Sequence, residues 1–312
     1  MISFDARKNI TFYDYLYSNI AFILLPLKDI ITFRKIYKNY IQVIKQRREN
    51  KFPIDATLKN GKKVTLQNLY QYRMYTWKAE NYCNFKNEFL IINKPNLPEI
   101  KLIGWEENGD LGAIFFDNDY NSLPVKGNTV VDIGANIADS SIYFALNGAK
   151  KIYALEPSPM NYKIAEKNIQ LNNLSNKIDL VLAGCSSKNG FVQMSSEDNG
   201  ILYSLENKDD GDVKIPLITL QEIIERSNND SVVLKIDCEG CEYEIINFSS
   251  PEILKKFSHI IIEYHYGYLN IKNKLENCGF KVTVSKPKIG KRLTSKKLKT
   301  YVGYLFAERI ND

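Results

Sequence analysis

The sequence contains few of the residues that build disulfide frameworks and metal centres. It has five cysteines and two histidines among 312 residues. The cysteines are scattered and odd in number, which favours reduced thiols over a disulfide framework. Cys238 and Cys241 form a CxxC spacing, but a zinc site takes about four ligands and no second pair completes it. We therefore expect no metal site, and reduced thiols indicate a cytoplasmic protein.

Long apolar runs are also missing. The longest one, Ile20–Leu27, contains Pro26 and ends at Lys28, well short of the roughly 20 residues that cross a bilayer. The first residues lack the basic leader and apolar region of a signal peptide. We therefore expect neither a membrane span nor a secretory leader.

No strong excess of charge is present either. The net charge is +6, so an anionic partner is permitted but not required. Apolar residues make up 44% of the chain and charged residues 25%, which is typical of a folded globular protein. The length suits one large domain with an extension, or two domains.

Residues 1–50 are predicted to be a helical extension. Apolar residues recur there at helical spacing, namely Ile30, Phe33, Ile36, Tyr37, Tyr40, Ile41 and Ile44. The intervening face is basic and carries Arg34, Lys35, Lys38 and Lys45. Packing against the rest of the protein is the favoured interpretation. Peripheral contact with an anionic membrane through residues 1–50 is the alternative.

Residues 51–109 are interpreted as a layer that leads into the main domain, which spans residues 110–312. Asn60-Gly61 predicts a hairpin turn. Short strands are expected at Phe89–Ile92 and Ala113–Phe116.

From Thr129 onward, apolar strands alternate with helices. Strands are expected at Thr129–Ile133, Lys151–Leu155, Ile178–Leu182, Val232–Ile236, His259–Tyr264, Phe280–Val284 and Tyr301–Ala307. Helices are expected at 140–147, from Pro159 to about Asn172, and at 219–227, with Ser158 as N-cap of the second. The alternation predicts an α/β, doubly wound, mostly parallel sheet. The polar stretch Gly190–Pro216 is either a hairpin or lid, or a plain surface insertion.

Four acidic residues stand at or near the ends of these strands: Asp132, Glu156, Asp237 and Glu263. In open α/β sheets that edge forms the ligand crevice. Glu156 follows Gly134 by 22 residues, where a carboxylate can bind the hydroxyls of a ribose. The unit is therefore predicted to bind an adenosine-type cofactor.

The type of cofactor follows from what the first turn lacks. Only Gly134 of a G-x-G-x-x-G fingerprint is present, so the backbone approaches a pyrophosphate poorly. Asp132 would repel a pyrophosphate but attract a cation. S-adenosylmethionine carries both a sulfonium and an ammonium group, so the electrostatics favour it over NAD.

Three stretches resemble the FkbM family of methyltransferases: Val130–Ile137 (VVDIGANI), Glu156-Pro157 and Leu234–Glu242 (LKIDCEGCE). The resemblance covers about residues 110–265. It implies a class I methyltransferase fold, Rossmann-like, with an antiparallel last strand. It also implies O-methylation, commonly of sugar or natural-product hydroxyls. The sequence departs from the family at Ala138, usually glycine, and at Cys238, usually aliphatic.

The resemblance also implies roles for individual residues. Asp132, Gly134, Ala135 and Asn136 would shape the methionine pocket, Glu156 and Pro157 would hold the ribose, Ala183 to Cys185 would edge the adenine, and Asp237 and Glu239 would lie between cofactor and acceptor. Beyond these motifs, Glu263 and His265 share one face of a strand end. His265 is either the general base, oriented by Glu263, or a structural histidine. Lys235 is expected to pair internally with an acid.

The leading hypothesis is an S-adenosylmethionine-dependent O-methyltransferase acting on a sugar, a glycolipid or a related small acceptor. An RNA or protein methyltransferase and a non-catalytic cofactor-binding protein are the alternatives. Asp237-Cys-Glu-Gly replaces the Asp/Asn-Pro-Pro turn of enzymes that methylate base amino groups. The basic run from Lys286 to Lys299 lacks interleaved aromatic residues, which disfavours nucleic acid. A solvated loop is its default interpretation, and binding to a phosphate-bearing acceptor, an anionic lipid or nucleic acid is the alternative.

Overall fold

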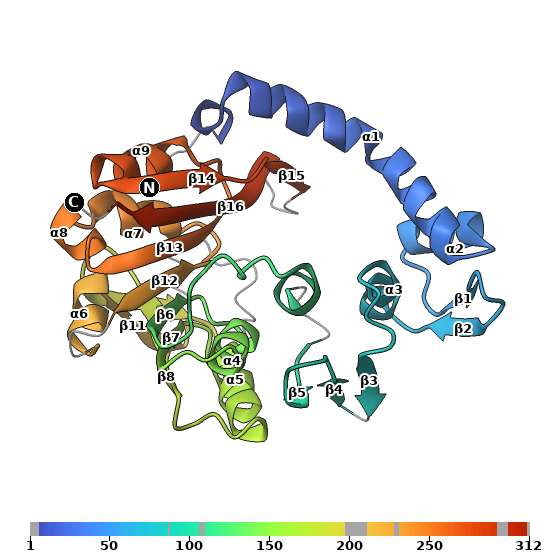
Figure 1. Ribbon diagram of the computed structural model, residues 1–312, viewed down its shortest axis with the longest axis horizontal. Helices are drawn as coiled ribbons and strands as arrows, with labels where there is room; N and C mark the ends of the chain where they lie inside the picture. Colours follow the sequence, from blue (N-terminus) through green and yellow to red (C-terminus); the bar gives the residue numbers. More distant parts are fainter. Residues whose placement is uncertain are drawn as a thin grey trace. The chain divides into compact units, whose positions relative to one another are not determined.

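The computed structural model describes residues 6–86, 88–105, 110–196, 211–227, 231–291 and 299–310. The chain divides into two compact units (Figure 1). The larger unit consists of Met1–Ser18 and Asp119–Asp312, and the smaller one of Asn19–Asn118.

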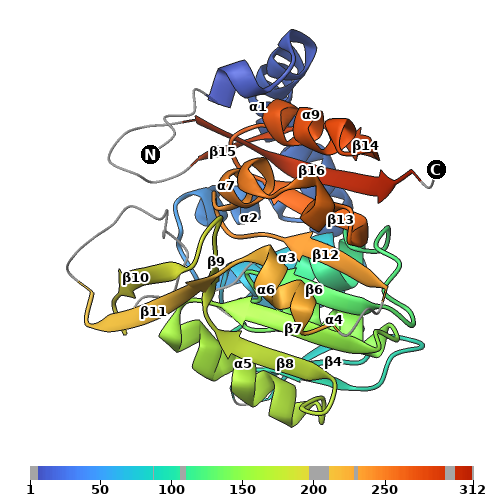
Figure 2. The same ribbon diagram turned by 90° about the vertical axis from the view of Figure 1, so that its left-hand side faces the viewer.

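A mixed sheet forms the centre of the larger unit (Figure 2). Its strands are β6 (Thr129–Ile133), β7 (Lys151–Glu156), β8 (Ile178–Leu182), β12 (Val232–Ile236), β13 (Phe257–Tyr264), β14 (Phe280–Val284) and β16 (Lys299–Arg309). Their order is β14-β16-β13-β12-β6-β7-β8. From β13 to β8 all neighbours are parallel, whereas β16 is antiparallel to both β13 and β14. The expected fold, with an antiparallel last strand, is confirmed.

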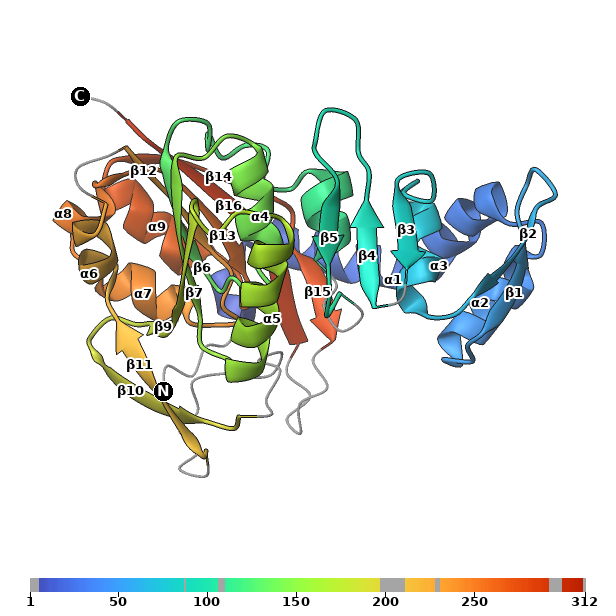
Figure 3. The ribbon, with the colours of Figure 1, turned by 90° about the horizontal axis from the view of Figure 1, so that it is seen from below.

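Helices cover both faces of this sheet. They are α4 (Asp139–Leu146), α5 (Pro159–Leu171), α6 (Leu220–Glu225), α7 (Glu242–Phe248), α8 (Pro251–Leu254) and α9 (Leu269–Asn277). Figure 3 shows α4 and α5 on one face, with α6, α7 and α9 on the other. Every residue of β6 and β12 is buried, as expected for parallel strands covered on both sides. Ser158 caps α5 as predicted, because its side chain accepts a hydrogen bond from the Asn161 N–H.

A small second sheet lies after β8. Its order is β10-β11-β9, with β9 at Gly184–Cys185, β10 at Gly190–Met194 and β11 at Val213–Ile218. β10 and β11 are antiparallel, so the hairpin, one of the alternatives left open for Gly190–Pro216, is the one that the described residues form. The rest of that stretch, 197–210, lies outside the described residues, and with it the lid interpretation.

The basic run between the last strands is partly described. Lys288–Lys291 forms β15, which pairs with β16. The ammonium group of Lys286 lies 4.4 Å from the centre of the Tyr17 ring. Residues 292–298 of the run lie outside the described residues.

The smaller unit has its own core. β1 (Ile54–Thr57) and β2 (Lys63–Leu66) form the hairpin predicted from Asn60-Gly61, in which Gly61 has a φ of +93°. The other elements are α2 (Tyr40–Arg48), α3 (Leu69–Thr76), β3 (Cys83–Lys86), β4 (Phe89–Ile92) and β5 (Ile100–Leu102). Buried aromatic residues such as Phe33, Tyr37 and Tyr72 dominate the core.

The strand expected at Ala113–Phe116 is wrong. Residues Ala113–Asp117 form a π-helical turn, η2. Ile114 and Phe115 are adjacent and both buried, a pattern that suits a helical turn better than the alternating faces of a half-buried strand. A short apolar run does not distinguish the two structures by its sequence.

The helices expected within residues 1–50 are present as α1 and α2, but the first one is longer than the apolar pattern indicated. The two compact units divide the chain between Ser18 and Asn19, inside this expected extension. After a 3-10 turn at Ala6–Asn9, α1 runs from Phe12 to Ile36 without a break at Pro26. By length and composition this helix is long and apolar enough to cross a membrane. The expectation that no segment meets that criterion is therefore wrong, because the helix continues through proline and past Lys28.

Candidate active site

The carboxyl ends of β6, β7, β12 and β13 meet at one edge of the main sheet. Ile133, the last residue of β6, pairs with Leu155 of β7 and with Ile236 of β12. Ile236 pairs in turn with Ile262 of β13. The residues that follow these strands therefore lie side by side, as parallel pairing requires.

Gly134 is required where β6 turns toward α4. Its φ is +78°, and a Cβ at this position would lie 1.8 Å from the backbone oxygen of Asp237. The Asp237 N–H donates to the Ile133 carbonyl at 3.0 Å. Glycine adopts this positive φ without strain. The close approach it permits is to the protein's own chain, at the end of β12.

The rest of the turn also uses left-handed backbone. Asn136 has a φ of +52° and Ala138 a φ of +67°. Glycine adopts this conformation without the strain that an L-residue carries, which gives a physical reason for the glycine that the FkbM pattern has at position 138. The Ala138 methyl group and Ala135 are fully buried.

A buried ion pair between β6 and β12 stabilises this turn. Lys235 Nζ lies 2.9 Å from Asp132 Oδ1, and both side chains are almost completely shielded from solvent. Asp132 Oδ2 accepts hydrogen bonds from the hydroxyls of Ser140 and Ser141. Lys235 also donates to the Gly134 carbonyl at 2.7 Å. The internal pairing expected for Lys235 is confirmed, and its partner Asp132 is engaged inside the protein.

Electrostatics keep the Lys235 side chain charged. Burial alone would lower the pKa of Lys235, but the carboxylates of Asp132 and Asp237 outweigh it and raise the pKa above its ordinary value. The ammonium group therefore remains charged at neutral pH and holds the Gly134 carbonyl in place.

Glu156 is buried at the end of β7 and ties two turns together. One carboxylate oxygen accepts from the Asn136 N–H and the other from the Ser158 N–H, each at 2.8 Å. Burial raises the pKa of Glu156 to about 7, although both hydrogen bonds oppose the rise. A carboxylate has about four acceptor positions, so Glu156 can accept further donors beside the turn.

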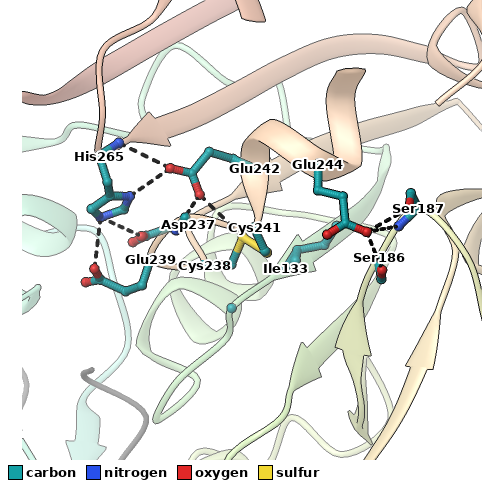
Figure 4. Close-up of a disulfide and its surroundings, with 12 residues drawn as sticks. Ile133, Ser186, Ser187, Asp237, Cys238, Glu239, Cys241, Glu242, Glu244 and His265 are labelled. Carbon is teal, nitrogen blue, oxygen red and sulfur yellow. Dashed lines mark hydrogen bonds and ion pairs between the residues drawn. A yellow bond between two sulfur atoms is a disulfide. The ribbon is translucent and has the colours of Figure 1, made fainter. Parts of the chain in front are cut away.

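A second group of acids surrounds His265, directly after β13. The Nε2 atom lies 3.4 Å from Glu239 Oε2 and 3.9 Å from Asp237 Oδ1. On the other side of the ring, Nδ1 lies 3.0 Å from Glu242 Oε1, which also accepts from the His265 N–H. Figure 4 shows the three carboxylates directed at the imidazole. We call these four residues the His265 cluster.

The charge of the His265 ring follows from this environment. Burial alone would lower its pKa, but the charge and hydrogen bond of Glu242 raise it, with smaller contributions from Asp237 and Glu263. The resulting pKa is about 9. At neutral pH the ring is therefore mostly an imidazolium, and three carboxylates leave the His265 cluster net negative.

Glu242 is the functional residue that the sequence analysis missed. It stands in the LKIDCEGCE motif but received no role, and the orienting carboxylate was expected from Glu263. In the structure Glu242 is completely buried and its Oε2 accepts from the Gly240 N–H at 2.7 Å. The second acid of the EGxE pattern was the signal available, because a buried first-turn carboxylate needs a partner.

The loop that carries Glu239 is closed by a disulfide between Cys238 and Cys241. The expectation of reduced thiols is wrong for this pair, because the loop brings their Cα atoms to 5.5 Å, within the range of a disulfide. Cys83, Cys185 and Cys278 are free. Glu239 has a φ of +59°, so the bridge closes a loop with left-handed backbone.

The residues expected to edge the adenine follow directly after β8, whose last residue, Leu182, pairs with Glu156. Ala183 and Cys185 are buried in the hydrophobic core, and burial raises the pKa of the Cys185 thiol. The next residues, Ser186 and Ser187, donate hydroxyl hydrogen bonds to Glu244 of α7 at 2.8 and 2.6 Å. The segment after β9 is thereby tied to the same helix that carries Glu242 (Figure 4).

The Asp132–Lys235 pair yields a first prediction. Lys235→Met leaves a buried carboxylate without its cation, which should lower the free energy of unfolding by about 3–5 kcal/mol. The double variant Lys235→Met, Asp132→Asn should recover part of that loss. Chemical denaturation measures both, and equal loss in the single and double variants would contradict a pair-specific cost.

The disulfide yields a second prediction. Closing so short a loop restricts the unfolded chain modestly, so reduction should lower the free energy of unfolding by about 2 kcal/mol. Denaturation with and without a phosphine reductant measures this, with Cys238→Ser, Cys241→Ser as the variant that reduction should not affect. Titration of five free thiols in protein purified without reductant would contradict the bridge.

Comparison with known proteins shows which sequences this chain resembles. Residues 132–282 match the family model described as the methyltransferase FkbM domain. The ribosomal protein L11 methyltransferase of Carboxydothermus hydrogenoformans is 44% identical over 55 residues, which are 18% of each protein. Methyltransferase sdnD of Sordaria araneosa is 24% identical over 214 residues, covering 55% of this chain and 83% of that protein.

Solved structures show weaker likeness. The structure of M. jannaschii TYW2 in complex with AdoMet has a TM-score of 0.39 and 18% identity, covering 73% of this chain and 89% of that one. The family match spans both the Gly134 turn and the His265 cluster. Through residues 132–282, just under half of its length, the chain is similar to the FkbM domain of S-adenosylmethionine-dependent methyltransferases.

Proposed function

We propose that this protein transfers a methyl group from S-adenosylmethionine to a hydroxyl of a sugar, a glycolipid or a related small acceptor. The observation that carries the proposal is the His265 cluster at the carboxyl ends of β12 and β13. It offers proton acceptors beside the turn that the FkbM match includes.

The residues beside Gly134 suit the cofactor. Glu156 is a buried carboxylate with acceptor positions to spare, which fits the hydroxyls of a ribose. The net negative charge of the His265 cluster fits a cationic sulfonium nearby. Asp132 would act indirectly, because its charge is already matched by Lys235. Gly134, Ala135 and Asn136 would then supply backbone around the methionine part.

Bound S-adenosylmethionine supplies an activated methyl group, so the protein's main tasks are to align the acceptor and to accept its proton. Glu242 holds Nδ1 of His265, which leaves Nε2 to exchange a proton with the acceptor hydroxyl. Asp237 and Glu239 flank Nε2 and would accept hydrogen bonds from hydroxyls of the acceptor that neighbour the reacting one. We therefore assign His265 as general base and Glu242 as the residue that positions it.

The charge of the site helps to distinguish small-molecule, RNA and protein acceptors. A net negative cluster disfavours an acceptor phosphate close to the reacting atom, which speaks against RNA. A protein acceptor would be separated by its methylated peptide. A protein that binds the cofactor without turnover would give calorimetric binding but no methylated product from any extract.

Glu156 yields a prediction for cofactor affinity. Ribose hydroxyls donate to the ionised carboxylate, so affinity for S-adenosylmethionine should rise as the pH rises through about 7 and fall below it. Glu156→Gln should weaken binding about tenfold at pH 8 and remove this pH dependence. Calorimetry measures both. Glu166→Gln, at an exposed position on α5, is the matched control, and equal affinity for the two variants would refute the assignment.

His265 yields a prediction for the chemical step. Only the neutral imidazole accepts a proton, so kcat should rise with pH toward about 9. His265→Ala should lower kcat by about 10²–10⁴ and abolish that rise. Glu242→Gln removes a charge that raises the pKa of His265, so its rise should occur at lower pH. Mass spectrometry of glycan and glycolipid extracts incubated with labelled cofactor detects the product.

Two measurements separate the outcomes. Full activity in His265→Ala would rule out the general base while leaving the hydroxyl acceptor intact. Nuclear magnetic resonance titration of the His265 ring reports its pKa in wild type and in Glu242→Gln without any acceptor. An unchanged pKa in the variant would contradict the positioning role of Glu242.

A further inference from the structure

The middle of α1 exposes apolar side chains in consecutive positions. We call Ile20–Leu27 the α1 apolar segment; its sequence, IAFILLPL, contains no charged or polar residue. All eight residues are exposed, with Ile23 at 72% and Leu27 at 56%. Because consecutive residues project in different directions around a helix, the segment is apolar on every side. Such a helix normally lies in a protein core or in lipid.

The described residues leave much of this segment's surface exposed, with Phe22 the least exposed of its large side chains at 37%. Further along the same helix, Phe33 is 4% exposed and stacks on Tyr72 with ring centres 4.7 Å apart. Tyr37 is completely buried in the same core. Where α1 meets this core, Phe33 is buried, whereas Ile30 and Ile31 of the same helix are exposed. The α1 apolar segment instead gathers, along one continuous stretch, an apolar surface of the kind that marks an interaction site.

A basic flank follows the segment directly. Lys28, Arg34, Lys35 and Lys38 are all exposed. The acidic residue within this flank, Asp29, lies 3.9 Å from the guanidinium of Arg48, which offsets its charge. An apolar helix segment with adjacent exposed cations is complementary to a surface that has an acyl interior and anionic headgroups.

We propose that the α1 apolar segment inserts into the surface of an anionic lipid membrane, with the basic flank at the headgroups. The observations favour lipid as the occupant. A helix segment that is apolar on every side does not present one defined face to a protein partner, whereas acyl chains can contact apolar side chains in any direction. The proposal does not depend on the proposed acceptor, although it would bring the enzyme to membrane-borne hydroxyls.

The helix lies in the interface and does not span the bilayer. At one end, the Ser18 hydroxyl donates to the Pro287 carbonyl at 2.7 Å, so α1 is held by the larger unit. At the other end, Phe33 is held in the core of the smaller unit. Only fourteen residues lie between the two anchored positions, Ser18 and Phe33, and they rise about 21 Å. A hydrocarbon core of about 30 Å needs roughly 20 residues.

The test is sedimentation of the full chain with vesicles. Wild type should pellet with phosphatidylcholine vesicles that contain phosphatidylserine, and less so as salt is raised. Ile23→Glu, Leu27→Glu should reduce binding at least tenfold. Arg34→Glu, Lys35→Glu should reduce it on anionic vesicles only. Ile310→Glu, at a position 60% exposed in the larger unit, is the matched control and should bind as wild type does.

Each other outcome overturns the proposal. Wild type that stays in the supernatant with anionic vesicles, or an Ile23→Glu, Leu27→Glu variant that pellets normally, excludes lipid as the occupant. A dimer in analytical ultracentrifugation that the same variant dissociates, without vesicle binding, assigns the segment to a second copy. Resistance of bound protein to alkaline carbonate extraction contradicts the interfacial geometry. Circular dichroism and calorimetry with S-adenosylmethionine verify that the variants remain folded.

Discussion

The buried ion pair between Asp132 and Lys235 is the interaction on which the candidate site depends. It joins the two central strands, β6 and β12, at the point where both turn toward the ligand edge. Lys235 reaches the Gly134 carbonyl, and the hydroxyls of Ser140 and Ser141 bind Asp132. Two charges buried in a sheet are costly unless paired and hydrogen-bonded. Here the pairing also locks the turn that approaches Asp237.

In this arrangement each acid at the sheet edge has different contacts. Asp132 forms an ion pair with Lys235 inside the protein. Glu156 accepts a hydrogen bond from the turn after β6, and Asp237 belongs to the His265 cluster. Separate environments give the two titrating groups different pKa values, about 7 for Glu156 and about 9 for His265. The same edge can therefore offer a carboxylate for hydroxyl donors and an imidazole for proton exchange.

The α1 helix shows a different relation between sequence and environment. One end contributes the buried ring of Phe33 to a core, while the middle exposes an apolar run. The free energy gained by burying an apolar side chain depends on the area that its neighbours cover. Composition alone therefore does not separate these two parts of the helix. In the proposed arrangement, the exposed middle of α1 is the part that contacts a membrane surface outside the protein.

The sequence by itself determined the main sheet, because apolar strands of β6 or β12 type alternate with amphipathic helices, and local periodicity suffices for that. It also located Gly134, Glu156 and Asp237 at strand ends, since parallel strands share one edge. Only the tertiary structure decided the rest. Glu242 meets His265 across 23 positions, Cys238 meets Cys241, and Asp132 turns inward to Lys235. Such contacts depend on side-chain direction between separate elements, which no local pattern encodes.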